Sequence, residues 1–158
     1  MKTEFEISEP HTAEGIWSLI SDVITHDLSF PSLAIEHFSQ NFTDKELFRR
    51  IQCSDIPVFI ASKNGCLAGA LIGSSPEGGV GTIIWLIVSS KFRGAGIGKA
   101  LFKKACEAYR SMGCHKVKLA ASTEEAVKFY EKIGMSVEGQ HMSHWWMLDF
   151  WSLGKLLH

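Results

Sequence analysis

The chain has 158 residues and a formal net charge of −1. This length suits one domain with its own core, so we expect residues 1–158 to form a single domain. The near-neutral charge lacks the basic excess that nucleic acids and anionic membranes attract, so we expect neither as a partner.

The four cysteines indicate a reducing compartment. No two of them form a Cys-x-x-Cys pair, and we expect buried free thiols rather than disulfides or metal ligands. The first ten residues lack the apolar region of a signal peptide, and no apolar run reaches the ~18–20 residues that span a bilayer. We therefore expect a cytoplasmic protein that needs no metal.

The N-terminal half predicts one strand, three helices and a hairpin. Thr12 is a candidate N-cap for the first helix, and Thr43 with Glu46 has the spacing of a capping box for the third. Asn64 and Gly65 predict a tight turn, because both residues tolerate positive φ. The expected strands are residues 3–8, 57–62 and 66–73, and the expected helices, caps included, are residues 12–26, 33–42 and 43–51.

The stretch from Ile83 to Ala105 is the most informative part of the chain. Ile83 to Val88 is an apolar, partly β-branched run, typical of a strand that is covered on both faces. A turn with three glycines at alternate positions follows it, and the next apolar residues recur at helical spacing. Backbone N–H groups at the start of such a helix favour an anion, so the turn predicts a pyrophosphate site. The turn is Arg93-Gly94-Ala95-Gly96-Ile97-Gly98, and the helical apolar residues are Ile97, Leu101, Ala105, Ala108 and Met112.

Two common phosphate-binding loops do not fit this turn. A P-loop requires Ser or Thr after its Gly-Lys pair, whereas Gly98-Lys99 is followed by Ala100. A dinucleotide fingerprint requires a third glycine where Lys99 stands. The turn resembles instead the Arg-x-x-Gly-x-Gly/Ala coenzyme A-binding motif of the GNAT acyltransferase superfamily, through Arg93, Gly96 and Gly98. A glycine-rich turn without a ligand is the alternative interpretation.

The C-terminal third continues the alternation of strands and helices. Gly113 is predicted to end the helix that begins at the turn, and Ser122 with Glu125 forms a second candidate capping box. The expected strands are residues 82–88, 116–120, 136–140 and 144–151, and the expected helices are residues 96–112 and 122–133. This order predicts a mixed sheet with helices on both faces.

A second motif of the same superfamily lies in residues 126–135. This segment resembles the pattern Ala-x-x-x-Tyr-x-Lys-x-Gly through Ala126, Tyr130, Lys132 and Gly134. Together with the element order, the resemblance covers nearly the whole chain and is specific from residue 83 to residue 135. It implies an α/β (α+β) fold with a mixed, mostly antiparallel sheet of about six to seven strands, flanked by helices on both faces.

The resemblance implies an N-acetyltransferase that uses acetyl-CoA as co-substrate and acetylates a primary amine of a small molecule or peptide by direct attack. In the family, the strand before the turn separates from its neighbour, and the freed backbone holds the pantetheine arm. We expect the Val88 N–H to polarise the thioester carbonyl and Tyr130 to protonate the leaving thiolate, although the spacing of Tyr130 also fits a core aromatic. The residues implied to bind the cofactor are Leu86, Ile87, Val88, Arg93, Gly94, Ala95, Gly96, Ile97, Gly98, Lys99 and Thr123.

Two positions depart from the family pattern. Thr123 stands where the family often has an Asn that contacts the cofactor, and Lys118 stands where some members carry a Glu general base. The base is therefore unassigned, and a non-catalytic acetyl-CoA-binding sensor or scaffold, or a structural protein, is an alternative. Besides a water chain, the candidate bases are His26, Asp27, Glu36, His37, His141 and His144.

Aromatic residues are concentrated in the first two helices and in the last segments. They predict either core packing or a pocket wall suited to an apolar or cationic amine. The apolar end, residues 150–157, requires cover from the domain or from a partner, so we also expect a homodimer. These aromatic residues are Trp17, Phe30, Phe38, Phe42, Trp145, Trp146, Phe150 and Trp151.

Overall fold

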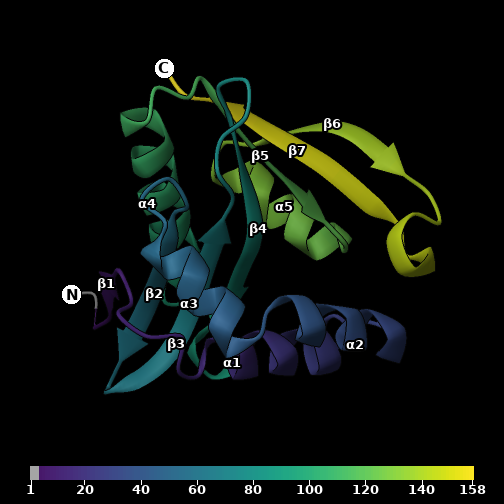
Figure 1. The fold of residues 1–158 in the computed structure, drawn as a ribbon. Helices are drawn as coiled ribbons and strands as arrows, with labels where there is room; N and C mark the ends of the chain where they lie inside the picture. Colours follow the sequence, from purple (N-terminus) through teal and green to yellow (C-terminus); the bar gives the residue numbers. More distant parts are fainter. Residues whose placement is uncertain (1–3) are drawn as a thin grey trace.

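The computed structural model describes residues 4–158 as seven strands in one sheet with five α-helices around it (Figure 1). The strands are β1 (Glu6–Ser8), β2 (Val58–Lys63), β3 (Cys66–Gly73), β4 (Val80–Val88), β5 (Lys116–Ala121), β6 (Ser136–His141) and β7 (Phe150–Leu156). The helices are α1 (Ile16–Asp22), α2 (Ser32–Asn41), α3 (Asp44–Gln52), α4 (Ile97–Ser111) and α5 (Glu124–Lys132). Within this described part, no helix is long and apolar enough to span a membrane.

The sheet has the order β1-β2-β3-β4-β5-β7-β6, and only the β4–β5 pair is parallel. One buried cluster joins α1, α2 and α3 to one face of the sheet, and a second cluster joins α4 and α5 to the other face. The predicted mixed, mostly antiparallel sheet with helices on both faces is therefore confirmed.

Strands β4 and β5 pair over only three residues each. Val80–Thr82 lie opposite Lys116–Lys118. From Ile83 onward β4 pairs only with β3, and from Leu119 onward β5 pairs only with β7. Figure 1 shows the two strands diverging from this short contact. The sheet thus consists of two halves that are joined at one end of β4.

A bulge in β4 lies next to the point of divergence. Ile72 of β3 is opposite Trp85, whereas the next residue of β3 is opposite Ile83, so Ile84 is the extra residue. A bulge bends its strand and breaks the alternation of side chains. As a result Ile83 packs in the α4 cluster and Trp85 packs in the α1–α3 cluster, which explains how one apolar run covers both faces.

Helix α4 confirms the predicted apolar spacing. Ile97, Leu101 and Ala105 are fully buried against the sheet. The helix lies between Gly96 and Gly113, whose φ angles of 84° and 82° place both in the left-handed region that glycine adopts without strain.

The two predicted caps have different outcomes. Thr43 Oγ1 accepts the Glu46 N–H at 3.2 Å, as predicted, but the Glu46 carboxylate pairs with arginines of its own helix. The prediction of Ser122 as the cap of α5 is wrong by one residue, because Thr123 has the extended backbone of an N-cap. Its Oγ1 accepts the Ala126 N–H at 3.1 Å.

The N-terminal segment differs from the prediction at its first helix. Glu6–Ser8 forms the predicted strand, and the Thr3 end of that prediction lies outside the described residues. The Thr12 cap is wrong: α1 begins at Ile16, directly after Gly15, whose φ is 79°. The helix then continues as a π-helix from Val23 to Asp27.

The last strand, predicted over residues 144–151, exists but begins later, at Phe150. The segment before β7 is a compact loop, in which the Ser143 N–H donates to Asp149 Oδ1 and the His144 N–H donates to the Leu148 carbonyl, both at 2.8 Å. Trp146 has a positive φ, which no extended strand allows. The apolar character of this run reflects aromatic packing rather than strand pairing, and β7 begins only at Phe150.

The cysteines are all free thiols, as predicted. Their predicted burial is correct for Cys106 and Cys114 and wrong for Cys66, which is exposed at the β2–β3 hairpin. The Asn64-Gly65 turn of that hairpin has positive φ at both residues, as predicted.

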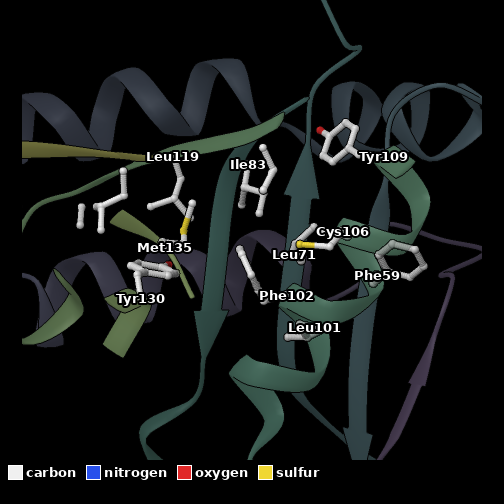
Figure 2. Close-up of a cluster of buried hydrophobic side chains, with 14 of the residues drawn as sticks. Phe59, Leu71, Ile83, Leu101, Phe102, Cys106, Tyr109, Leu119, Tyr130 and Met135 are labelled. Atoms are coloured by element: carbon white, nitrogen blue, oxygen red, sulfur yellow. The ribbon is translucent and has the colours of Figure 1, made fainter. Parts of the chain in front are cut away.

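Tyr109 of α4 fixes the joined end of β4. Its hydroxyl accepts the Ser74 N–H at 3.0 Å and lies 2.8 and 2.9 Å from the Ser74 and Thr82 carbonyl oxygens, to which it donates. Its ring lies directly on Gly81, and Figure 2 shows its hydroxyl at the edge of the apolar cluster. Burial raises the pKa of Tyr109 to about 12.

We predict that Gly81→Ala destabilises the protein by about 1–3 kcal/mol, because the added Cβ overlaps the Tyr109 ring. In a Tyr109→Ala background the ring is absent, so the same substitution should cost little. Urea unfolding of the two single variants and the double variant measures this coupling. Additive losses in the double variant would contradict the proposed contact.

Candidate functional site

The unpaired edge of β4 presents backbone groups where β5 has separated. The Ser89 N–H donates to the Ala68 carbonyl at 2.8 Å. Because hydrogen bonding alternates along an antiparallel pair, the N–H and C=O groups of Ile87 also point to β3, and those of Leu86 and Val88 point to the opposite edge. Leu86 and Val88 thus have backbone groups available at the divergence.

Ile87 occupies a different environment from its two neighbours. Its side chain is buried in the cluster with α1–α3, and its backbone groups face β3. Of the three strand residues expected to hold the pantetheine arm, Ile87 therefore offers no free backbone group to this edge.

The glycine-rich turn connects β4 to the first turn of α4. Gly94 and Gly96 have φ angles of 80° and 84°, and an added Cβ at either would meet no atom within 4 Å. Glycine is required at these two positions by the backbone conformation and not by neighbouring atoms. Ala95 is partly buried against the core, Ile97 is fully buried, and Lys99 is exposed on the first helical turn.

Gly98 has a different reason to be glycine. A Cβ there would lie 3.0 Å from the Phe129 ring of α5 and 3.6 Å from the Val88 side chain. The start of α4, the end of β4 and helix α5 therefore meet at Gly98. Sequence reasoning missed Phe129 at this position, and the structure leaves its side chain 36% exposed.

Arg93 does not extend toward the N–H groups of the turn. Its Nη2 lies 2.6 Å from Asp27 Oδ2, and its Nε and Nη2 each lie 3.4 Å from the Val88 carbonyl oxygen. No residue pattern could indicate this contact, because Asp27 is 66 residues away. Asp27 was a candidate base, and the structure pairs its carboxylate with a guanidinium.

Tyr130 is buried on α5, with 9% of its surface exposed. Figure 2 shows it among apolar side chains next to Met135, and its ring meets Phe129 edge-on at 5.2 Å between centroids. Burial raises the pKa of Tyr130 above its ordinary value. The phenol therefore remains protonated at neutral pH, which is the state that a general acid requires.

Thr123 begins the same helix. Its hydroxyl oxygen accepts the Ala126 N–H, and this leaves the hydroxyl proton free to donate to a ligand. The N-cap role and the expected contact with the cofactor are thus chemically compatible.

Aromatic residues of α2 meet the loop before β7 on the other side of the sheet. Trp146 lies 5.2 Å from the His37 ring and 6.0 Å from the Phe38 ring, and Phe38 lies 5.0 Å from Trp85. Most of the aromatic residues singled out in the sequence lie in the core. The contact of Trp146 with α2 is where the N-terminal helices meet the C-terminal segment. Trp85, which sequence reasoning assigned only to a strand, is part of it.

The histidine candidates for the base lie at the surface. His37 packs on Trp146, and His141 lies 5.0 Å from His144 between ring centroids and 3.4 Å from the Ser152 hydroxyl through its Nε2. Lys118 is exposed on β5 at the last residue that pairs with β4. Among residues 4–158, no three His, Cys, Asp or Glu side chains form a group that could hold a metal ion.

Comparison with known proteins places this geometry in a family. The model of the acetyltransferase (GNAT) family matches residues 27–135. Glucosamine 6-phosphate N-acetyltransferase of Trypanosoma brucei brucei is 46% identical over 63 residues, which is 40% of this chain and 42% of that protein. The Arabidopsis thaliana protein of the same name is 44% identical over 66 residues, 42% of this chain and 44% of its own. The chain thus matches less than half the length of these curated relatives.

Solved structures share the fold at low sequence identity. The PaiA N-acetyltransferase of Thermoplasma acidophilum, in complex with coenzyme A, has a TM-score of 0.80 over 99% of both chains at 18% identity. An acetyltransferase of the GNAT family from Streptococcus pneumoniae has a TM-score of 0.78 over 98% of this chain and all of its own, at 20% identity.

We predict that Gly96→Ala weakens coenzyme A binding at least tenfold, about 1.4 kcal/mol, because a Cβ would stand where the turn approaches phosphate. Gly113→Ala is the matched control. Gly113 ends the same helix with the same φ and equally open surroundings, so both variants should lose similar stability. Calorimetric titration with coenzyme A, beside thermal melting, compares them. Equal affinities in the two variants would contradict a pyrophosphate site at this turn.

Proposed function

This chain belongs to the acetyltransferase (GNAT) family, and from that premise we propose that it is an N-acetyltransferase, which moves the acetyl group of acetyl-CoA directly to a primary amine. The observation that carries the proposal is the divergence of β4 from β5 after three paired residues. It leaves the backbone of Leu86 and Val88 at an open edge, which the short segment Ser90–Phe92 connects to the glycine turn. An extended pantetheine arm fits such an edge as an added strand would.

Each step of the transfer has a proposed group. The amine lone pair attacks the thioester carbonyl carbon, and the Val88 N–H donates to the oxygen as negative charge develops on it. The intermediate then expels the coenzyme A thiolate, which takes a proton from the Tyr130 hydroxyl. The proton lost by the attacking nitrogen passes to solvent, and Tyr130 regains its proton from there. The turn at residues 93–99 holds the pyrophosphate through backbone N–H groups at the start of α4.

We propose that the acceptor amine enters from the sheet face opposite α4. Lys118 lies on that face, where its partner Thr82 is ~20 Å along β4 from Val88. It lines a hollow of about 350 Å³ with Ser74, Thr82 and Lys116 at the joined end of the strand. Lys116 is already paired with Glu138 at 2.7 Å, and Glu77 also lines the hollow. At that distance from Val88 the exposed Lys118 ammonium acts by attracting an acceptor with an anionic group toward this face, and the curated relatives are named for such an acceptor, glucosamine 6-phosphate.

Further proposals concern the context of the chain. We propose one domain, supported by a single sheet that runs from β1 to β6, and a cytoplasmic location, supported by four free thiols. Most of the apolar end is covered by the domain itself, because Phe150, Leu153 and Leu157 are buried, whereas Leu156 is 54% exposed. The proposal of a homodimer therefore depends on Leu156 of the last strand and on exposed apolar side chains of the loop before β7, such as Met142 and Met147, the latter 85% exposed.

Tyr130→Phe tests the general acid. The variant keeps the ring and loses the proton donor, so we predict that kcat falls by ~10²–10⁴-fold while acetyl-CoA affinity stays near that of the wild type. Since burial raises the pKa of Tyr130, the wild-type phenol stays protonated to higher pH than an exposed tyrosine. Titration of Tyr130 should therefore not lower kcat until the pH is above about 10.

Tyr109→Phe is the control, because Tyr109 is the other tyrosine of the chain. Its hydroxyl holds backbone groups of Ser74 and Thr82, so its loss should lower stability by about 1–3 kcal/mol and leave kcat unchanged. If Tyr130→Phe instead loses stability and keeps full kcat, Tyr130 is a core residue.

A panel of amines tests the proposed activity. Thiol release from acetyl-CoA should require a primary amine, and glucosamine 6-phosphate should be a better acceptor than glucosamine. Lys118→Met should reduce that preference and leave the rate with amines that carry no anionic group unchanged. Binding of acetyl-CoA without release by any amine would favour the sensor or scaffold function, and absence of binding would exclude both.

A further inference from the structure

Arg93 and Asp27 connect two distant parts of the candidate site. Asp27 ends the π-helix that continues α1, and Arg93 begins the glycine turn. Their side chains approach to 2.6 Å between Oδ2 and Nη2, with 25% and 49% of each exposed. The same guanidinium also faces the carbonyl oxygen of Val88, at 3.4 Å from both Nε and Nη2.

Val88 is the last residue of β4 and the proposed donor to the thioester oxygen. Its N–H faces the open edge, and no β5 residue pairs with it there. Because β5 does not pair with this end of β4, the position of Val88 depends on its pairing with β3 and on side-chain contacts. The Arg93 guanidinium supplies one such contact at the carbonyl of this residue.

We propose that Asp27 is a positioning residue: it holds Arg93 on the Val88 carbonyl and so fixes the residue that polarises the thioester. Arg93, the first residue of the coenzyme A motif, then acts on β4 and is not a ligand of the pyrophosphate. This inference rests on the proposed acetyl transfer.

The charges favour this assignment. The Arg93–Asp27 pair carries no net charge to offer a phosphate, because the Arg93 Nη2 already donates to the Asp27 carboxylate. The backbone N–H groups of the turn remain free for the anion. A carboxylate this close to the turn would repel a pyrophosphate if Arg93 left it. The neutral pair is therefore better suited to a structural contact with β4 than to binding phosphate.

Two single variants and their double variant test the inference. Asp27→Asn removes the carboxylate charge, and Arg93→Lys keeps a cation but loses the planar fork that spans Asp27 and Val88. We expect each to lower kcat by about tenfold, as misplacement of a catalytic group does, with the dissociation constant of coenzyme A unchanged. The double variant should be no slower than the slower single variant, because both act through one contact.

A second readout does not depend on the acceptor. In acetyl-CoA labelled with ¹³C at the thioester carbonyl, the bound resonance reports polarisation of that carbonyl. It should move toward its free position in both variants. Lys91→Met, which removes a nearby exposed cation from the segment Ser90–Phe92, is the control and should leave the resonance in place.

Three results would overturn the inference. If Arg93 is a phosphate ligand, Asp27→Asn frees it and tightens coenzyme A binding, while Arg93→Gln weakens binding by about tenfold or more with kcat unchanged. If the pair is only a surface contact, neither variant changes kcat or the carbonyl resonance. If wild-type protein does not bind acetyl-CoA, the proposed function fails together with the inference. Wild-type binding without any accepted amine affects the proposed function alone, because the resonance still tests Asp27.

Discussion

The separation of β4 from β5 is the constraint on which the rest of the structure depends. A strand in the middle of a sheet normally satisfies its backbone groups on both sides, and an unpaired edge there requires another partner. Here β4 loses its neighbour after Thr82, although the sheet continues beyond it as β5, β7 and β6. The edge is thus held open within the fold.

Several features keep the two halves joined at one end and separate at the other. Tyr109 ties α4 to the joined end through Ser74 and Thr82, and only glycine at position 81 leaves room for its ring. The bulge at Ile84 then bends β4 and divides its side chains between two cores. Because helices α1–α3 and α4 pack on opposite faces of β4, the strand stays in place without its neighbour on that side.

Local signals allowed the sequence to predict much of this fold. The glycine turn, the Asn64-Gly65 hairpin and the Thr43 cap each depend on residues that are adjacent in the chain, and all three are confirmed. The segment 144–151 failed because aromatic side chains that pack in a loop look like a buried strand when only their hydrophobicity is known. The shift from Ser122 to Thr123 is a boundary error of the same local kind, since both residues are competent caps.

The same distinction applies to the candidate site: features that depend on neighbouring residues could be predicted, and features that depend on distant residues could not. The turn and the tyrosine could be found from motifs, because their residues are close in sequence. The direction of the Leu86 and Val88 backbone groups depends on the register with β3, which a bulge shifts by one residue, so hydrophobic pattern alone could not give it. The contact of Arg93 with Asp27 depends on a π-helix that no residue pattern announced.

The two tyrosines show why a residue type does not decide a role. Both are buried in the same apolar cluster. The Tyr109 hydroxyl is hydrogen-bonded to Ser74, and this bonding opposes the rise in pKa that burial causes. For Tyr130, burial alone raises the pKa. Its proton is therefore held in an apolar setting, on the helix whose neighbouring residue, Phe129, touches the glycine turn. In the proposed mechanism the Tyr130 hydroxyl is left to protonate the thiolate, because no backbone group among the described residues binds it, whereas the Tyr109 hydroxyl holds the strand.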